Sequence, residues 1–132
     1  MFEIFRFTQR QTDDFFNGAK HDFTIATQAT VPDVTFRFAY DALIKLAIAI
    51  CADHGLRVKA QQGHHVELIE KLAEYLGDPE IQVVLNKFRQ KRNWNLYYGG
   101  TVISEKAVAE YLTWTQTVFG KAQQYFNRGK LL

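Results

Sequence analysis

Apolar residues recur at spacings of three and four positions in five segments of this chain, whereas the alternation typical of β-strands is nearly absent. Such spacing places the apolar side chains on one face of a helix, and that face must pack against other helices. The clearest segment is the last one, whose apolar side consists of Ile103, Ala107, Tyr111, Trp114, Val118, Ala122 and Tyr125. Short connections between amphipathic helices favour antiparallel neighbours, so the sequence predicts an all-α, antiparallel helical bundle of about five helices.

Prolines, glycines and capping residues mark the ends of these predicted helices. Asp33 and Asp78 each stand next to a proline, so they are expected to cap the second and fourth helices. Gly55 and Gly77 are expected to end the second and third helices, because glycine readily adopts the left-handed conformation found at such ends. Together these signals predict helices over residues 8–29, 33–54, 64–76 and 79–98, and a last helix that opens at Ser104.

The length of 132 residues predicts a single domain that covers residues 1–132. Within it, residues 1–31 are expected to form either an N-terminal arm or the first helix of the bundle. Helical spacing from Phe16 to Ala26 favours a helix, whereas the partial alternation from Phe2 to Phe7 fits a short extended arm.

The composition of the chain limits the classes of function. The net charge is only +2, so any affinity for nucleic acid must come from a local cluster of cations. Cys51 is the single cysteine, which excludes an intramolecular disulfide, fits a reducing compartment and predicts a buried, inert thiol. The N-terminus lacks a signal-peptide pattern, and the most apolar stretch, residues 42–52, is too short to span a bilayer. We therefore expect a cytoplasmic protein without membrane contact.

The histidines do not have the spacing of known metal sites. No two of His21, His54, His64 and His65 lie four residues apart, and none follows a glutamate at the third position upstream. The adjacent rings at positions 64 and 65 point to different sides of a helix start, so no metal is expected there. No glycine-rich phosphate loop is present either, so no cofactor is expected. Ser104, the single serine, is expected to cap a helix rather than act as a nucleophile.

Four cations fall within six positions from Lys87 to Arg92, where the fourth predicted helix approaches its end. The helix dipole leaves partial negative charge there, so a solvated, dipole-matched helix end is the simplest interpretation. That interpretation does not account for Arg92, which continues the apolar stripe of Ile81, Leu85 and Phe88. An arginine in line with a core stripe is expected either to pack with a partner or to point into a shared cleft or interface.

From about Phe36 to Phe126 the chain resembles a known family, the HEPN domains (higher eukaryotes and prokaryotes nucleotide-binding). The order and spacing of three parts carry the resemblance: a long helix that ends in His54-Gly55-Leu56, then Gly63-His64-His65 before the next helix, and the run Phe88-Arg89-Gln90-Lys91-Arg92-Asn93-Trp94-Asn95-Leu96-Tyr97-Tyr98-Gly99. Arg-Asn followed shortly by an aromatic residue and glycine is typical of many HEPN proteins. The resemblance implies a HEPN-like helical domain.

Many HEPN domains resemble metal-independent ribonucleases, whose signature is an arginine, often followed by asparagine, and a histidine after a gap of four to six residues. By resemblance, Arg92 takes the place of the arginine and Asn93 that of the asparagine. The histidine is missing, because the residues after gaps of four, five and six are Tyr97, Tyr98 and Gly99. An unperturbed tyrosine has a pKa of ~10, so its base form is about a thousandfold too scarce at pH 7 for general-base catalysis.

Three functions remain open. The leading expectation is a HEPN-like dimeric domain, non-catalytic or weakly catalytic, that binds a nucleic acid such as RNA or a partner protein through the Arg92 end of the fourth helix. The second is an RNA endonuclease that uses Arg92 with Tyr97, through a strongly shifted pKa or with a histidine such as His64 or His65 arriving from elsewhere in the fold. The third is a purely structural interaction module, in which Arg92 forms a buried hydrogen-bonded pair. In the first reading, phosphate contacts and base stacking come from Lys87, Arg89, Lys91, Trp94 and Tyr98.

The resemblance also implies partners. HEPN proteins often stand beside a minimal nucleotidyltransferase in two-component toxin–antitoxin or defence systems, so such a partner is expected from the resemblance alone. The aromatic residues Trp94 and Tyr98 favour an interface at the end of the motif helix. We therefore expect a homodimer with Arg92 of each chain near the two-fold axis.

Overall fold

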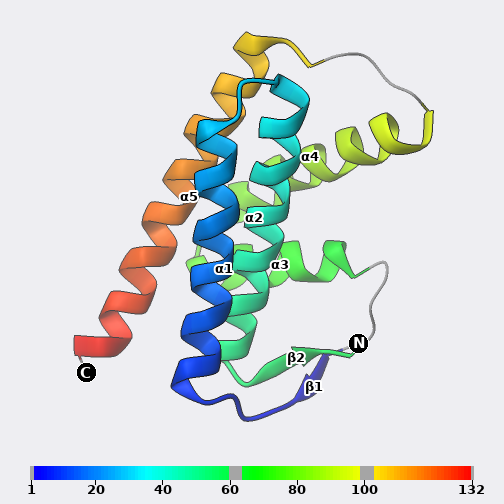
Figure 1. Ribbon diagram of the computed structural model, residues 1–132. Helices are drawn as coiled ribbons and strands as arrows, with labels where there is room; N and C mark the ends of the chain where they lie inside the picture. Colours follow the sequence, from blue (N-terminus) through cyan, green and yellow to red (C-terminus); the bar gives the residue numbers. More distant parts are fainter. Residues whose placement is uncertain (1, 60–63, 99–102, 132) are drawn as a thin grey trace.

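The computed structural model describes residues 2–59, 64–98 and 103–131, and for residues 95–98 and 129–131 it describes only the helical backbone. Along the chain the elements are β1 (Phe2–Ile4), α1 (Gln9–Gln28), α2 (Pro32–Asp53), β2 (Leu56–Val58), α3 (His65–Leu76), α4 (Pro79–Tyr98) and α5 (Glu105–Leu131) (Figure 1). The predicted all-α helical bundle is confirmed, with five helices among the described residues. Each predicted helix end lies within one residue of the observed one.

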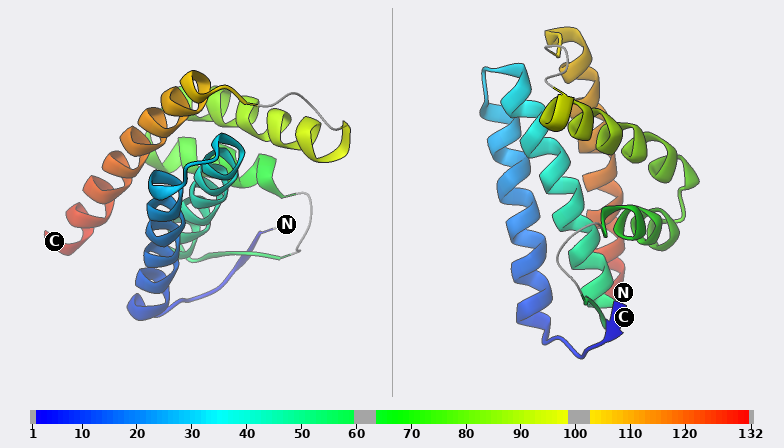
Figure 2. Two further views of the ribbon diagram at one scale, coloured as in Figure 1. Left: turned by 45° about the horizontal axis from the view of Figure 1, so that its top comes forward. Right: turned by 90° about the vertical axis from the view of Figure 1, so that its right-hand side faces the viewer.

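Helix α2 is the centre of the fold, and each of the other four described helices packs against it. Helices α1 and α2 run antiparallel side by side, whereas α3 and α4 run antiparallel to each other and lie across α2 (Figures 1 and 2). The start of α3 and the end of α4 therefore project to the same side of the molecule, on the right in Figure 1. This crossing brings together residues from three helices.

The sequence of α2 explains its central position. A helix that is apolar on nearly all sides is stable only when it is surrounded, and from residue 42 to residue 52 the only charged residue is the exposed Lys45. The alanines in this stretch let neighbouring helices approach closely. The largest side chains of α2 that are fully buried are Tyr40, Leu43, Leu46 and Ile50.

A cluster of aromatic rings holds the middle of α4 against α2 and α5. Phe88 is 2% exposed, and its ring centroid lies 5.8 Å from that of Phe36, 4.4 Å from that of Tyr111 and 5.3 Å from that of Trp114. Arg92 follows one helical turn later on the same stripe. The buried anchor therefore places Arg92 at the margin of the core.

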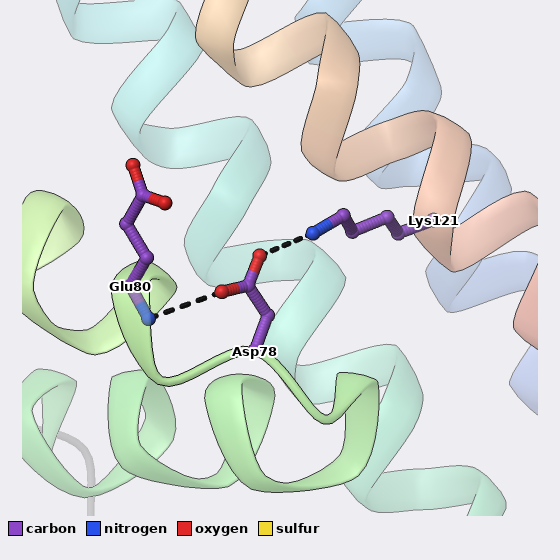
Figure 3. Close-up of polar contacts among 3 residues, drawn as sticks. All are labelled: Asp78, Glu80 and Lys121. Atoms are coloured by element: carbon purple, nitrogen blue, oxygen red, sulfur yellow. Dashed lines mark hydrogen bonds and ion pairs between the residues drawn. The ribbon is translucent and has the colours of Figure 1, made fainter.

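Asp78 fixes the start of α4 in the way that the sequence predicts. Its Oδ1 accepts a hydrogen bond from the backbone N–H of Glu80 at 3.1 Å, which caps the helix (Figure 3). Its Oδ2 forms an ion pair with Nζ of Lys121 on α5, so the same carboxylate ties two helices together. The hydrogen bond from Lys121 lowers the pKa of Asp78 below its usual value.

Other predicted helix ends are confirmed, with one exception. The Oγ of Ser104 accepts a backbone N–H of α5 at 3.1 Å, and Gly77 ends α3 with a left-handed φ of 66°. The prediction that Asp33 caps the second helix is wrong, because α2 begins at Pro32 and its N-cap is Val31. Asp33 lies within the first turn, where its Oδ1 accepts the backbone N–H of Ile103 at 3.4 Å.

Both expectations for residues 1–31 are met in part. Residues 9–28 form α1, and the extended arm before it pairs as β1 with β2, antiparallel, with Phe2 opposite Val58. Gly55, whose φ is 72°, turns the chain from α2 into β2, and its carbonyl accepts the N–H of Phe5 at 2.9 Å. Strand β2 was not predicted, because three residues carry too little pattern.

Two further expectations concern burial and membranes. Cys51 is 1% exposed, and burial raises its pKa to about 12, so its thiol is inert as predicted. Among the described helices, none combines the length and the apolar composition that crossing a bilayer requires.

Candidate functional site

Arg92 lies half-buried on α4, where the apolar stripe of that helix meets solvent. Its guanidinium carbon lies 5.6 Å from the centroid of the Tyr40 ring on α2, within the range of a cation–π contact. Its Nη1 donates a long hydrogen bond of 3.5 Å to Oδ1 of Asn93. No carboxylate of a described residue forms an ion pair with Arg92, so the buried pair of the structural-module reading is not seen in this part of the chain.

Tyr40 connects the arginine to the start of α3. Its ring is fully buried, and its Oη lies 2.7 Å from Nδ1 of His65, a hydrogen-bonding distance. Burial raises the pKa of Tyr40 to about 12, although Arg92 and Arg89 act in the opposite direction. The phenol is therefore protonated at neutral pH and remains a hydrogen-bonding partner of the imidazole.

His65 is half-buried and carries no charge at neutral pH. Its pKa lies below the ordinary value because burial disfavours the imidazolium, and because Arg92 and Arg89 repel that cation. A histidine thus lies within electrostatic range of Arg92, but it comes from α3 and not from α4, the helix that carries the Arg92-Asn93 pair. Of the two histidines that the sequence offered for this role, the structure brings His65 to the Tyr40 hydroxyl.

Two more charged side chains complete this group. Arg89 lies on α4 one turn before Arg92, and its Nε donates to Oδ1 of Asn86 at 3.1 Å. Asp41 follows Tyr40 on α2; burial raises the pKa of its carboxyl, whereas Arg92 and Arg37 lower it. Arg92 thus acts electrostatically on Tyr40, Asp41 and His65, whereas Arg89 acts on Tyr40 and His65. We call this group the arginine site, and it consists of Tyr40, Asp41, His65, Arg89 and Arg92.

The other cations of the basic run lie on a different face of α4. Lys87, Lys91 and Trp94 are spaced by four and three residues, so they share one side of the helix. Tyr40 and His65 respond electrostatically to both arginines but to neither lysine. Trp94 is 56% exposed. We call these three residues the basic stripe; the sequence grouped them with the arginines as one surface, whereas the structure separates them.

The remaining predicted site residues are only partly described. Asn93 is half-buried and accepts the hydrogen bond from Arg92, so it orients the guanidinium. Tyr97 and Tyr98 lie in the last turn of α4, and their side chains are outside the described residues. Their predicted roles in catalysis and base stacking therefore stay predictions.

The chemistry of the arginine site suits an oxyanion. A guanidinium can bind a phosphate with two parallel N–H donors, and a neutral imidazole beside it can donate or accept one hydrogen bond. The N-terminus of α3 adds partial positive charge, and its N-cap residue His64 makes no side-chain capping bond. Among the described residues, no group of three or more His, Cys, Asp or Glu side chains could hold a metal ion.

Sequence reasoning missed Tyr40 and Asp41 as members of the site. The signal that could have identified Tyr40 is its phenol, because a tyrosine buried in a helical core needs a hydrogen-bond partner. That partner, His65, is 25 positions away in the sequence. Only the crossing of α3 over α2 makes the two meet.

A second polar cluster lies at the other end of α2. The Oη of Tyr125 donates to Oδ2 of Asp53 at 2.6 Å and lies 2.6 Å from Nε2 of His54, whose ring stacks on Tyr75 with centroids 3.7 Å apart. These groups form hydrogen bonds with one another, so the cluster fastens α5 to α2 and α3.

A cavity of about 460 Å³ at the α3–α4 turn is lined mainly by charged and small residues: Glu70, Lys71, Ala73, Glu74, Gly77, Asp78, Pro79 and Gln82.

No family model matches this chain, and neither a curated protein nor a solved structure matches it. The resemblance to HEPN domains therefore depends only on the residues and spacings quoted above.

Proposed function

We propose that this protein is a HEPN-like domain that binds single-stranded RNA through the arginine site and the basic stripe of α4. The observation that carries the proposal is the state of Arg92. Its guanidinium contacts Tyr40 and Asn93, is partly exposed, and has no carboxylate partner among the described residues. Such a group can bind a phosphate without losing an ion pair to any residue that the structure describes.

The surroundings of Arg92 support a nucleic acid over a small isolated anion. The basic stripe adds two lysines and an indole on another face of the same helix. Cations track a phosphate backbone, and aromatic rings stack on unpaired bases without regard to sequence. Because the net charge of the whole chain is only +2, we expect the affinity for RNA to come from this local cluster of cations.

The wider setting of this proposal follows from the family resemblance. A homodimer with Arg92 of each chain near the two-fold axis would double the number of cations that one RNA meets. A minimal nucleotidyltransferase partner in a toxin–antitoxin or defence system, and a cytoplasmic location, belong to the same proposal. A partner protein in place of RNA would occupy the same end of α4.

One observation favours a second candidate function, an RNA endonuclease. Attack of a ribose 2′-OH on the neighbouring phosphate needs a general base with a pKa near or below neutrality. His65 is such a group, because it is neutral at pH 7 and lies within electrostatic range of Arg92. In this candidate His65, not Tyr97, takes the proton, and Arg92 stabilises the charge that develops on the phosphate.

Binding of a labelled single-stranded RNA, followed by fluorescence anisotropy at several salt concentrations, tests the leading proposal. Arg92→Ala is expected to weaken binding by about tenfold to a hundredfold, the usual value of a charge-assisted hydrogen bond. It should also reduce the slope of log affinity against log salt by about one. Arg10→Ala, which removes an exposed cation on α1, is the matched control and should leave both quantities unchanged. Equal binding by both variants would refute the proposal.

An assay of RNA cleavage separates the two candidates. If the protein cleaves RNA, Arg92→Ala and His65→Gln should each abolish turnover. Cleavage that survives Arg92→Ala would come from a contaminant or another site. Binding without cleavage by the unmodified protein would leave the leading proposal and exclude the second.

A further inference from the structure

We infer that His65 is an anion-binding residue of the arginine site and that it binds its anion as the imidazolium, so that anion and proton bind together. The inference deepens the proposed function and rests on the arginine site being the place where phosphate binds. It makes RNA affinity rise as the pH falls.

The geometry that supports the inference is the contact between Tyr40 and His65. With Oη of Tyr40 at 2.7 Å from Nδ1, one ring nitrogen of His65 is already engaged, whereas Nε2 bonds to no described residue. A phenol can either donate or accept a hydrogen bond. If the imidazole takes up a proton, Tyr40 becomes the acceptor for Nδ1–H, and the cation keeps a partner for each nitrogen.

The charges that face His65 explain why the proton is absent before the anion binds. Burial disfavours the imidazolium most, and from α4 the cations Arg92 and Arg89 act in the same direction. From α2, Tyr40 offers a hydroxyl that burial keeps neutral, whereas Asp41, the next residue on α2, is not among the groups that shift the pKa of His65. No described carboxylate forms an ion pair with His65 that would hold the imidazolium in place.

The start of α3 also carries His64 and Glu67, whose facing atoms are buried and make no hydrogen bond to a described residue. Nδ1 of His64 lies 3.9 Å from Oε2 of Glu67, in the first turn of the helix. The N-terminal end of α3 also carries partial positive charge, which further disfavours a cation at position 65.

An anion at the site reverses this balance. A phosphate or sulfate group between the guanidiniums cancels much of their repulsion and itself attracts the imidazolium. An opposite charge within hydrogen-bonding range typically shifts a titration midpoint by about 1 unit or more. Because linkage is reciprocal, an anion that raises the proton affinity of His65 must bind more tightly when that proton is present.

Nuclear magnetic resonance of the His65 ring protons, followed from about pH 5 to 8, measures this coupling directly. Spectra of the full chain are compared in sodium sulfate and in sodium chloride at matched ionic strength, so that general screening is the same in both. The His65 signal is assigned by its loss in His65→Gln. We expect sulfate to raise the midpoint of His65 by about 1 unit relative to chloride. The exposed His21 on α1 should show no difference and serves as the internal control.

Two variants, Arg92→Ala and His65→Gln, and RNA as a second ligand distinguish the possible outcomes. In Arg92→Ala the sulfate-specific shift should disappear, because the anion has lost its main partner. In RNA titrations, affinity should rise by up to about tenfold per pH unit as the pH falls between the two midpoints of His65, and His65→Gln should flatten this dependence.

A His65 midpoint that is identical in sulfate and in chloride would overturn the inference, even if RNA binds through Arg92 at every pH. RNA binding that is absent while sulfate still raises the midpoint would instead remove the proposed function and support the coupling of anion and proton at His65.

Discussion

Tyr40 and His65 are joined by a hydrogen bond of 2.7 Å that links the middle of α2 to the first turn of α3. Tyr40 is fully buried, and the guanidinium of Arg92 lies against its ring. One side chain thus supports the imidazole through its hydroxyl and the guanidinium through its π-face. The fold and the candidate site share this residue, so a change to its hydroxyl should affect both.

Removing that hydroxyl should destabilise the fold. Tyr40→Phe leaves Nδ1 of the half-buried His65 without its partner, and we expect the free energy of unfolding to fall by about 1–2 kcal/mol. Urea unfolding followed by circular dichroism measures this loss. Tyr111→Phe is the matched control, because the Tyr111 ring packs on Phe88 and its hydroxyl bonds to no described residue. Equal losses in the two variants would show that the hydrogen bond does not stabilise the protein.

The sequence alone predicted the helices because each depends on a local pattern. The apolar side of α5 and the Asp78-Pro79 start of α4 can be recognised from residues within a few positions of each other. The same pattern placed Arg92 at the end of a core stripe. The local pattern could not predict the contact between Tyr40 and His65. Amphipathic spacing identifies the buried face of a helix but not the angle at which the next helix crosses it.

Removing the charge of Arg92 should raise the pKa of His65. This pKa is lowered first by burial and then by Arg92 and Arg89, so Arg92→Ala removes one of the two repelling cations. The midpoint of the His65 ring signals should therefore move up towards the ordinary value of about 6.5. Lys87→Ala, a change on the other face of α4, should leave it unchanged. A midpoint that stays the same in Arg92→Ala would mean that burial alone sets it.

Acid should weaken the fold through His65. Because its pKa is lower in the folded protein than in the unfolded chain, the unfolded chain binds the proton first as the pH falls below about 6.5. The stability that neutral His65 permits is therefore complete above the unfolded pKa and is lost as the pH falls towards the folded one. Urea unfolding at about pH 7.5 and at about pH 5.5 should show a larger loss for the unmodified protein than for His65→Gln. The same loss in both would assign the acid sensitivity to other groups.

Phe88 should be the most costly apolar position to truncate on α4. Its ring fills the space between Phe36, Tyr111 and Trp114, so Phe88→Ala leaves a cavity and should lower the free energy of unfolding by about 3–5 kcal/mol. Val83→Ala, on the same helix but 57% exposed, should change it by less than about 0.5 kcal/mol. A small effect of Phe88→Ala would mean that α4 is not anchored through this ring, and Arg92 would then lack a fixed position.

Asp78 performs two functions at the start of α4, and two substitutions separate them. Asp78→Asn keeps an acceptor for the N–H of Glu80 but loses the ion pair with Lys121, which is partly exposed, so it should lower the free energy of unfolding by no more than about 1 kcal/mol. Asp78→Ala also removes the helix cap and should lower it by about 1–2 kcal/mol. Because Lys121 lowers the pKa of Asp78, the contribution of the ion pair is present above the ordinary pKa of the carboxyl and is lost as the pH falls through the folded one. Urea unfolding at neutral and acid pH checks both statements, and Lys121→Ala should behave like Asp78→Asn. Equal destabilisation by Asn and Ala at position 78 would assign the whole effect to the ion pair and none to the cap.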